Sequence, residues 1–128
     1  MDPVCCHLVR GLPAIEEGDD LAAMVRERFP VQDGDVVCIA STVVSKAEGR
    51  ARELEGYSPS ARAEEIAGKL EKDPRFVEAV LEEAAEVLLD DPFLLVATKF
   101  GHIGVNAGID RSNVSQGRIL LLPVDPGA

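Results

Sequence analysis

The spacing of apolar positions predicts three helices along the chain. In the first, apolar side chains recur three or four positions apart and would share one helical face: Leu21, Met24, Val25 and Phe29. Asp19 or Asp20 can cap the start of this helix, and Pro30 ends it. The second helix is expected over residues 58–72, with Ser58 as its cap.

The third helix opens at Asp73-Pro74, where the aspartate can cap it and the proline fits its first turn. Its apolar stripe comprises Val77, Val80, Leu81, Ala84 and Leu88. The residues that would face away are Glu78, Glu82, Glu83 and Glu86. Such a row of glutamates is typical of a solvated helix face rather than of a metal site.

Continuous apolar runs predict the strands. A strand running into a loop is expected over residues 5–15, and a strand buried on both faces over 36–41. Further strands are expected over 93–99 and 118–124. Strands mixed with helices predict an α+β (mixed α/β) fold, with a central mixed sheet and flanking helices. Residues 1–128 are expected to form a single domain.

Charge and cysteine usage narrow the class of protein. The formal net charge of −10 argues against nucleic acid or an anionic membrane as the main partner, because both require a cationic face. The sequence shows no signal peptide and no membrane span, so a cytoplasmic protein is expected. Cys5 and Cys6 are neighbours and cannot easily bridge each other. Cys38 is expected to be a small buried residue.

Two polar segments follow the first two predicted strands. In the segment GLPAI at 11–15, a rigid turn would expose main-chain N–H groups that can bind a base or a ribose, although an ordinary turn has the same composition. In ASTVVSKAEGR at 40–50, Ser41 and Thr42 supply hydroxyls at the end of a predicted strand, where ligands collect in α/β folds. Lys46 can reach a phosphate from there, but no Walker pattern is present.

The segment HIGVNAGIDRSNV at 102–114 is rich in glycine and short polar residues. Asp110 offers a hard oxygen ligand suited to Mg²⁺ or Mn²⁺. Asn113 and Asn106 can each donate and accept hydrogen bonds, as residues that bind a base or substrate must. Arg111 could pair with Asp110 or face water. The alternative is a glycine-rich turn capped by aspartate; His102 is more typical of a structural histidine than of a catalytic base.

Taken together, several segments resemble one enzyme family, nearly end to end and in the family's order. They are GLPAIEEGDDL at 11–21, GDVVCIASTVVSKAEGR at 34–50, DPRFVEAVLEEA at 73–84, GHIGVNAGIDRSNV at 101–114 and ILLLPVDP at 119–126. The family is the coenzyme F-420-0:gamma-glutamyl ligase, also called coenzyme F-420-0:L-glutamate ligase. STVVSKAEGR and NAGIDRSNV are its most specific motifs here.

The resemblance implies a GTP-dependent ligase that joins the amine of L-glutamate to the terminal carboxylate of the deazaflavin F-420-0, then adds a further glutamate through the γ-carboxylate. It implies an acyl-phosphate intermediate, Mg²⁺ or Mn²⁺, stimulation by K⁺, and an intertwined homodimer. Its implied guanosine pocket is Leu12, Pro13, Ala14 and Ile15. Its implied further GTP contacts are Ser41, Thr42, Lys46 and Asn113, and its implied metal ligand is Asp110.

The chain departs from the family in length, because family members are longer and their later half supplies further acidic metal ligands. The chain is therefore expected to correspond to the N-terminal part of the ligase, with the C-terminal half absent. Two other interpretations stay open. The chain could be a truncated, non-catalytic nucleotide-binding or assembly module of the same family, or a different amide-bond ligase.

Overall fold

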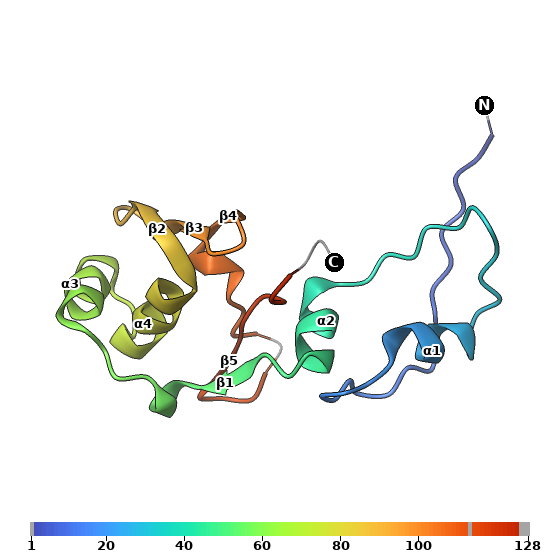
Figure 1. Ribbon diagram of the computed structural model, residues 1–128, viewed down its shortest axis with the longest axis horizontal. Helices are drawn as coiled ribbons and strands as arrows, with labels where there is room; N and C mark the ends of the chain where they lie inside the picture. The colour runs from blue at the N-terminus through green and yellow to red at the C-terminus, as the bar shows by residue number, and fades with distance from the viewer. Residues whose placement is uncertain (1, 113, 126–128) are drawn as a thin grey trace.

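The structure, a computed structural model, describes residues 2–112 and 114–125. Residues 2–40 form an extended arm that carries one short helix, α1 (Leu21–Arg26). The helix α2 (Ser41–Ala47) joins this arm to the compact part of the molecule (Figure 1). The Asp20 carboxylate caps α1 by accepting a hydrogen bond from the amide of Ala23 at 2.9 Å, which confirms the predicted start.

The compact part contains two small sheets and two longer helices. Its elements are β1 (Ala51–Glu53), the 3-10 turn η1 (Leu54–Gly56), α3 (Ala61–Leu70), α4 (Pro74–Glu83), β2 (Ala84–Leu89), β3 (Leu95–Thr98), β4 (Ile103–Val105), the 3-10 turn η2 (Asn106–Gly108) and β5 (Arg118–Leu120). β1 and β5 pair antiparallel, and β2, β3 and β4 form a three-stranded antiparallel sheet in that order. The α+β class is therefore confirmed, but two antiparallel sheets stand in place of one central mixed sheet.

The core lies where α3 and α4 pack against the strands. The two helices contribute the buried residues Ala63, Ile66, Ala67, Phe76, Val77, Ala79 and Val80, and the strands and their flanks contribute Leu94, Val96, Ile119 and Leu121. Burying one aliphatic side chain of this kind stabilises a fold by about 1.5–3 kcal/mol. Of the stripe predicted for the third helix, Val77 and Val80 lie in this core, whereas Leu88 is exposed.

The start of α3 and the end of α4 differ from the predicted boundaries. The Ser60 hydroxyl accepts from the amide of Ala63 at 3.2 Å and donates to Glu78 at 2.7 Å, so α3 begins two residues later than a Ser58 cap would place it. Asp73 caps α4 as predicted. Because α4 ends at Glu83 and continues directly into β2, Ala84 and Leu88 lie in a strand rather than on the predicted helical stripe.

Two of the predicted strands are wrong, those over residues 5–15 and 36–41. All residues from 31 to 40 are exposed, Asp33 and Gly34 form a turn, and Cys38 is exposed rather than buried. A strand needs a neighbouring backbone to satisfy its N–H and C=O groups, and no strand lies beside either segment in the described part of the chain. The other two predicted strands are confirmed as the shorter elements β3 and β5.

Among the described residues, no helix is both long enough and apolar enough to cross a membrane.

Candidate functional site

A cleft of about 430 Å³ lies between the arm, the end of α2 and the β1–β5 sheet. The residues that line it are Ala14, Ile15, Glu16, Glu17, Lys46, Gly49, Ala51, Val114, Ser115 and Arg118. Its volume falls within the range of about 300–1,000 Å³ that is usual for ligand pockets. A hydrogen bond of 2.8 Å from the amide of Gly18 to the carbonyl of Ala47 fixes the arm against α2.

Lys46 enters the cleft from the last turn of α2. Its ammonium forms no hydrogen bond or ion pair with another residue among those described. Thr42 lies four positions earlier and therefore on the same helical face. Ser41 and Thr42 were expected at the end of a strand, but they occupy the first turn of α2 and do not line the cleft.

The predicted guanosine segment divides in two. Ala14 and Ile15 line the cleft, whereas Leu12 and Pro13 are exposed and do not. The Arg28 guanidinium donates a hydrogen bond of 3.1 Å to the carbonyl of Gly11, which anchors the start of this segment to the end of α1. The segment is thus held from both sides, by Arg28 before it and by α2 after it.

The chain reaches Asp110 through an uncommon left-handed turn. Asn106, Ala107 and Gly108 have φ angles of 54°, 54° and 68°, although left-handed backbone costs a residue with a Cβ about 1–2 kcal/mol. The Asp110 amide then donates to the Leu120 carbonyl at 2.9 Å, and the Leu120 amide donates back at 2.8 Å. The turn therefore delivers Asp110 to β5.

The side chains around Asp110 are also fixed. The Asp110 Oδ1 atom accepts from the amide of Ser112 at 3.1 Å and from its hydroxyl at 2.7 Å. The Arg111 guanidinium lies 5.3 Å from the centre of the Phe76 ring. Arg111 is exposed, as one of the two expectations had it, and it also makes a cation–π contact with this ring.

The strand register places Asp110 on the sheet face that borders the cleft. Leu120 is paired with Ala51 on one side and with Asp110 on the other. Directly opposed residues of antiparallel strands project to the same face, and so do residues two positions apart on one strand. Asp110 consequently shares a face with Ala51 and Arg118, both of which line the cleft, although Asp110 itself is not among the lining residues.

The charged lining of the cleft has both signs. Lys46 and Arg118 are the cations, and Glu16 and Glu17 are the anions. The Nε atom of Arg118 lies 2.8 Å from Oε1 of Glu53, the residue opposite it on β1. The described residues contain no group of three or more histidine, cysteine, aspartate or glutamate side chains arranged to hold a metal ion.

The sequence analysis did not identify several residues that line the cleft, and one residue that it did identify is not among those described. Glu16, Glu17, Gly49, Ser115 and Arg118 were not singled out, since nothing in their spacing distinguishes them from ordinary turn and strand-end residues. Asn113 lies outside the described residues.

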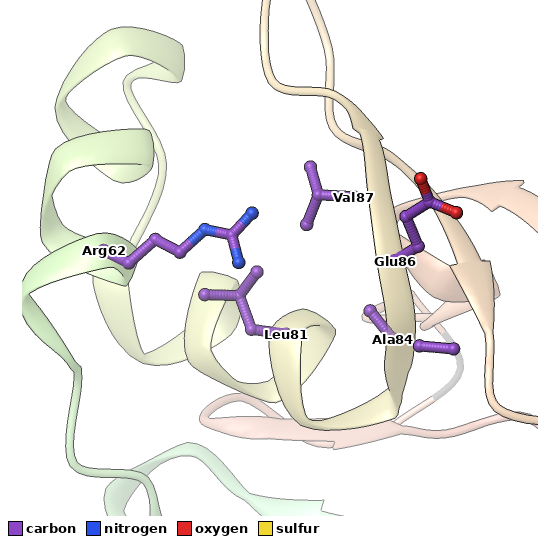
Figure 2. A pocket seen from close by; sticks show the side chains of 6 residues that line it. Arg62, Leu81, Ala84, Glu86 and Val87 are labelled. Carbon is purple, nitrogen blue, oxygen red and sulfur yellow. The ribbon is translucent and has the colours of Figure 1, made fainter.

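The histidine and the second cavity add no further site. The amide of His102 donates to the Thr98 hydroxyl at 3.1 Å in the β3–β4 hairpin, and the centre of its ring lies 6.1 Å from that of Phe100. A second cavity of about 70 Å³ lies between α3, α4 and β2, with Arg62, Leu81 and Val87 around it (Figure 2). This volume is far below that of a usual ligand pocket.

Comparisons with known proteins agree with the resemblance seen in the motifs. The family model described as F420-0:Gamma-glutamyl ligase matches residues 11–128. A coenzyme F420:L-glutamate ligase of Halobacterium salinarum is 60% identical over 124 residues, which are 92% of this chain and 49% of that protein. The ligase of Archaeoglobus fulgidus is 60% identical over 118 residues, 92% of this chain and 47% of that protein. The ligase of Methanosarcina mazei is 48% identical over 120 residues, 94% of this chain and 47% of that protein.

The chain thus spans about half the length of the curated relatives it matches. With a family model covering almost all of its residues and relatives at this level of identity, the chain belongs to the F420-0:gamma-glutamyl ligase family.

Proposed function

We propose that this chain carries the nucleotide site of a GTP-dependent ligase that adds L-glutamate to F-420-0. The observation that supports the proposal is the convergence of Ala14, Ile15 and Lys46, which are far apart in the sequence, on one cleft. Asp110 lies on the bordering sheet face. The reaction class comes from the relatives, which are named coenzyme F420:L-glutamate ligases.

The chemistry of the proposed reaction accounts for these residue types. A carboxylate becomes a good electrophile only after activation, and phosphorylation by GTP would give an acyl-phosphate that the amine of glutamate can attack. The transferred phosphoryl group gains charge that cations must stabilise. Lys46 would hold a phosphate by charge, and the backbone beside Ala14 and Ile15 would contact the nucleoside.

Asp110 fits a divalent ion as one ligand of a larger set. Its carboxylate supplies hard oxygen donors, and Mg²⁺ commonly binds through one or two carboxylates together with substrate phosphate oxygens. The ion, Mg²⁺ or Mn²⁺, would neutralise phosphate charge when bound. Ser112 would orient the carboxylate through its two hydrogen bonds to Oδ1.

Titration calorimetry with GTP and Mg²⁺ tests the nucleotide site directly. Lys46→Ala should weaken binding about tenfold or more, because a charge-assisted phosphate contact is lost. Asp110→Asn should weaken GTP binding only when Mg²⁺ is present. Lys99→Ala is the matched control, since Lys99 is an exposed lysine outside the cleft. Unchanged affinity in both site variants would refute the proposed nucleotide site.

A second candidate function is a non-catalytic nucleotide-binding or assembly module. It is favoured by the exposed apolar side chains of the arm, among them Val36, Val37 and Ile39, which suit burial in a larger assembly such as a homodimer. Mass spectrometry of F-420-0 incubated with GTP, L-glutamate and this chain separates the candidates. Glutamate addition by this chain alone excludes the non-catalytic module. Addition only by a full-length relative supports it.

A further inference from the structure

The proposed nucleotide contacts leave three charged side chains of the cleft unused, those of Glu16, Glu17 and Arg118. Glu17 and Arg118 line it together with Lys46. The Glu17 carboxylate is not suited to contact the phosphates assigned to Lys46, because like charges repel each other. A lining that pairs a carboxylate with a guanidinium instead suits a ligand that itself carries both charges.

Glu53 leaves the terminal edge of the Arg118 guanidinium open to a ligand. Glu53 lies beside its Nε edge at 2.8 Å, and no described residue accepts a hydrogen bond from either terminal nitrogen. The two terminal N–H groups form the planar fork that matches the two oxygens of a carboxylate. The turn before β5 is closed by a 3.1 Å hydrogen bond from the amide of Arg118 to the carbonyl of Ser115. This bond fixes the backbone position from which the Arg118 side chain extends.

The Glu17 side chain lies at the cleft, close to the backbone of Gly49. Gly49 has a φ angle of 65°, and a Cβ atom at this position would overlap the Glu17 carboxyl group. No described residue donates a hydrogen bond to the Glu17 side chain or pairs with it. The carboxylate therefore lies against Gly49 with its charge unneutralised by the protein.

We propose that Arg118 and Glu17 form an amino-acid subsite in this cleft. The Arg118 fork takes a carboxylate of a free acidic amino acid of the class of L-glutamate, and Glu17 takes its α-ammonium group. The subsite would bind one substrate of the proposed ligase, and it rests on the proposed function for the reaction that follows binding. Lys46 remains assigned to a phosphate of GTP, so GTP and the amino acid would lie along one cleft.

An NMR titration of the protein with L-glutamate tests the subsite. Concentrations up to about 50 mM cover the weak affinity expected for one substrate alone. Saturable amide shifts are expected at residues 14–17, 46–51 and 114–118. Arg118→Gln should weaken glutamate binding about tenfold or more, because a bidentate charged contact with a carboxylate is lost. Glu17→Gln should weaken it several-fold.

Matched controls separate the subsite from general charge effects. Arg62→Gln removes an arginine of α3 that lines the small cavity (Figure 2). Glu64→Gln removes an exposed carboxylate on the same helix. Both should leave glutamate affinity unchanged. Glutarate, which lacks the ammonium, should respond to Arg118→Gln but not to Glu17→Gln.

A structural role for Arg118 has its own readout. Glu53→Gln removes the ion pair with Arg118 but keeps the fork, so glutamate binding should persist within about twofold, as expected for an exposed pair. The proposal is overturned by absence of saturable shifts with the unmodified chain. It is also overturned if Glu53→Gln reproduces the loss seen with Arg118→Gln, or if neither Arg118→Gln nor Glu17→Gln weakens binding.

A measurement of GTP binding distinguishes this subsite from the nucleotide site. Arg118→Gln should leave the affinity for GTP and Mg²⁺ unchanged, and Lys46→Ala should leave the affinity for glutamate unchanged. Loss of GTP binding in Arg118→Gln would assign Arg118 to the triphosphate and overturn the amino-acid subsite. Failure of GTP binding in the unmodified chain would refute the nucleotide site alone.

Discussion

Replacing Arg50 by methionine should destabilise the protein strongly, although Arg50 lies outside the cleft. Its guanidinium donates from Nε to the Leu122 carbonyl at 2.9 Å and from Nη2 to Glu83 at 2.7 Å. The Arg50 side chain is 13% exposed and that of Glu83 is 25% exposed. Arg50 thus links the end of α4 to the segment after β5, at the point where α2 leads into β1.

The size of the effect follows from this partial burial. Breaking a fully buried ion pair costs about 3–5 kcal/mol, whereas exposed pairs contribute at most about 1 kcal/mol. A pair of intermediate exposure that also loses a charged hydrogen bond to a carbonyl should cost about 2–3 kcal/mol. For a chain of this size, each kcal/mol lowers Tm by about 4 °C, so a decrease of roughly 8–12 °C is expected.

Urea and thermal unfolding followed by circular dichroism measure this change. Arg52→Met is the matched control, because the exposed Arg52 donates, among the described residues, only to the nearby carbonyls of Gly49 and Ala51. It should cost less than about 1 kcal/mol. A double-mutant cycle of Arg50→Met with Glu83→Gln should give a coupling energy of about 1 kcal/mol or more. The reasoning is refuted if Arg50→Met costs no more than Arg52→Met, or if the coupling energy is zero.

Two further predictions concern stability. The hydrogen bond from the Arg75 side chain holds the pKa of Asp73 below its usual value, with partial desolvation opposing it. Because the folded-state pKa is the lower one, this stabilisation is complete above the unfolded value of about 3.9 and is lost as the pH falls through the folded value. Acid titration of unfolding should show this loss in the wild type and not in Asp73→Asn; equal acid dependence would contradict it. Gly108→Ala should cost about 2–3 kcal/mol, since its φ is 68° and the new Cβ would lie 2.5 Å from Leu122 Cδ1. Gly117→Ala, at a φ of 83° with no atom within 4 Å, should cost only about 1 kcal/mol in urea unfolding, and equal costs would refute the predicted clash.

The parts of the fold that local sequence determines were predictable. The cap and proline at Asp73-Pro74 and the apolar spacing that follows specify α4 within a few residues, because a helix satisfies its backbone locally. The segment at 36–41 has the composition of a buried strand, yet it is exposed here. Strand formation depends on a distant partner, and apolar composition alone does not supply one.

The site shows the same division between local and long-range information. Lys46 was identified from its residue type and from the family motif, and the structure places it in a cleft with Ala14 and Ile15. Arg118 gave no such signal, because its position in the cleft depends on the pairing of β5 with β1 and on the turn before it. Pairing between residues this far apart in the sequence is not encoded in local spacing.

The unpaired state of the segment 36–40 makes it a natural reporter. None of its five amides donates a hydrogen bond to another described residue. Backbone amides without such bonds exchange with solvent deuterium at rates close to those of an unfolded chain, while amides in α3 and α4 are protected by the stability of the core. Deuterium uptake along these five residues would therefore reveal when another polypeptide occupies the arm, even where the compact part of the molecule does not change.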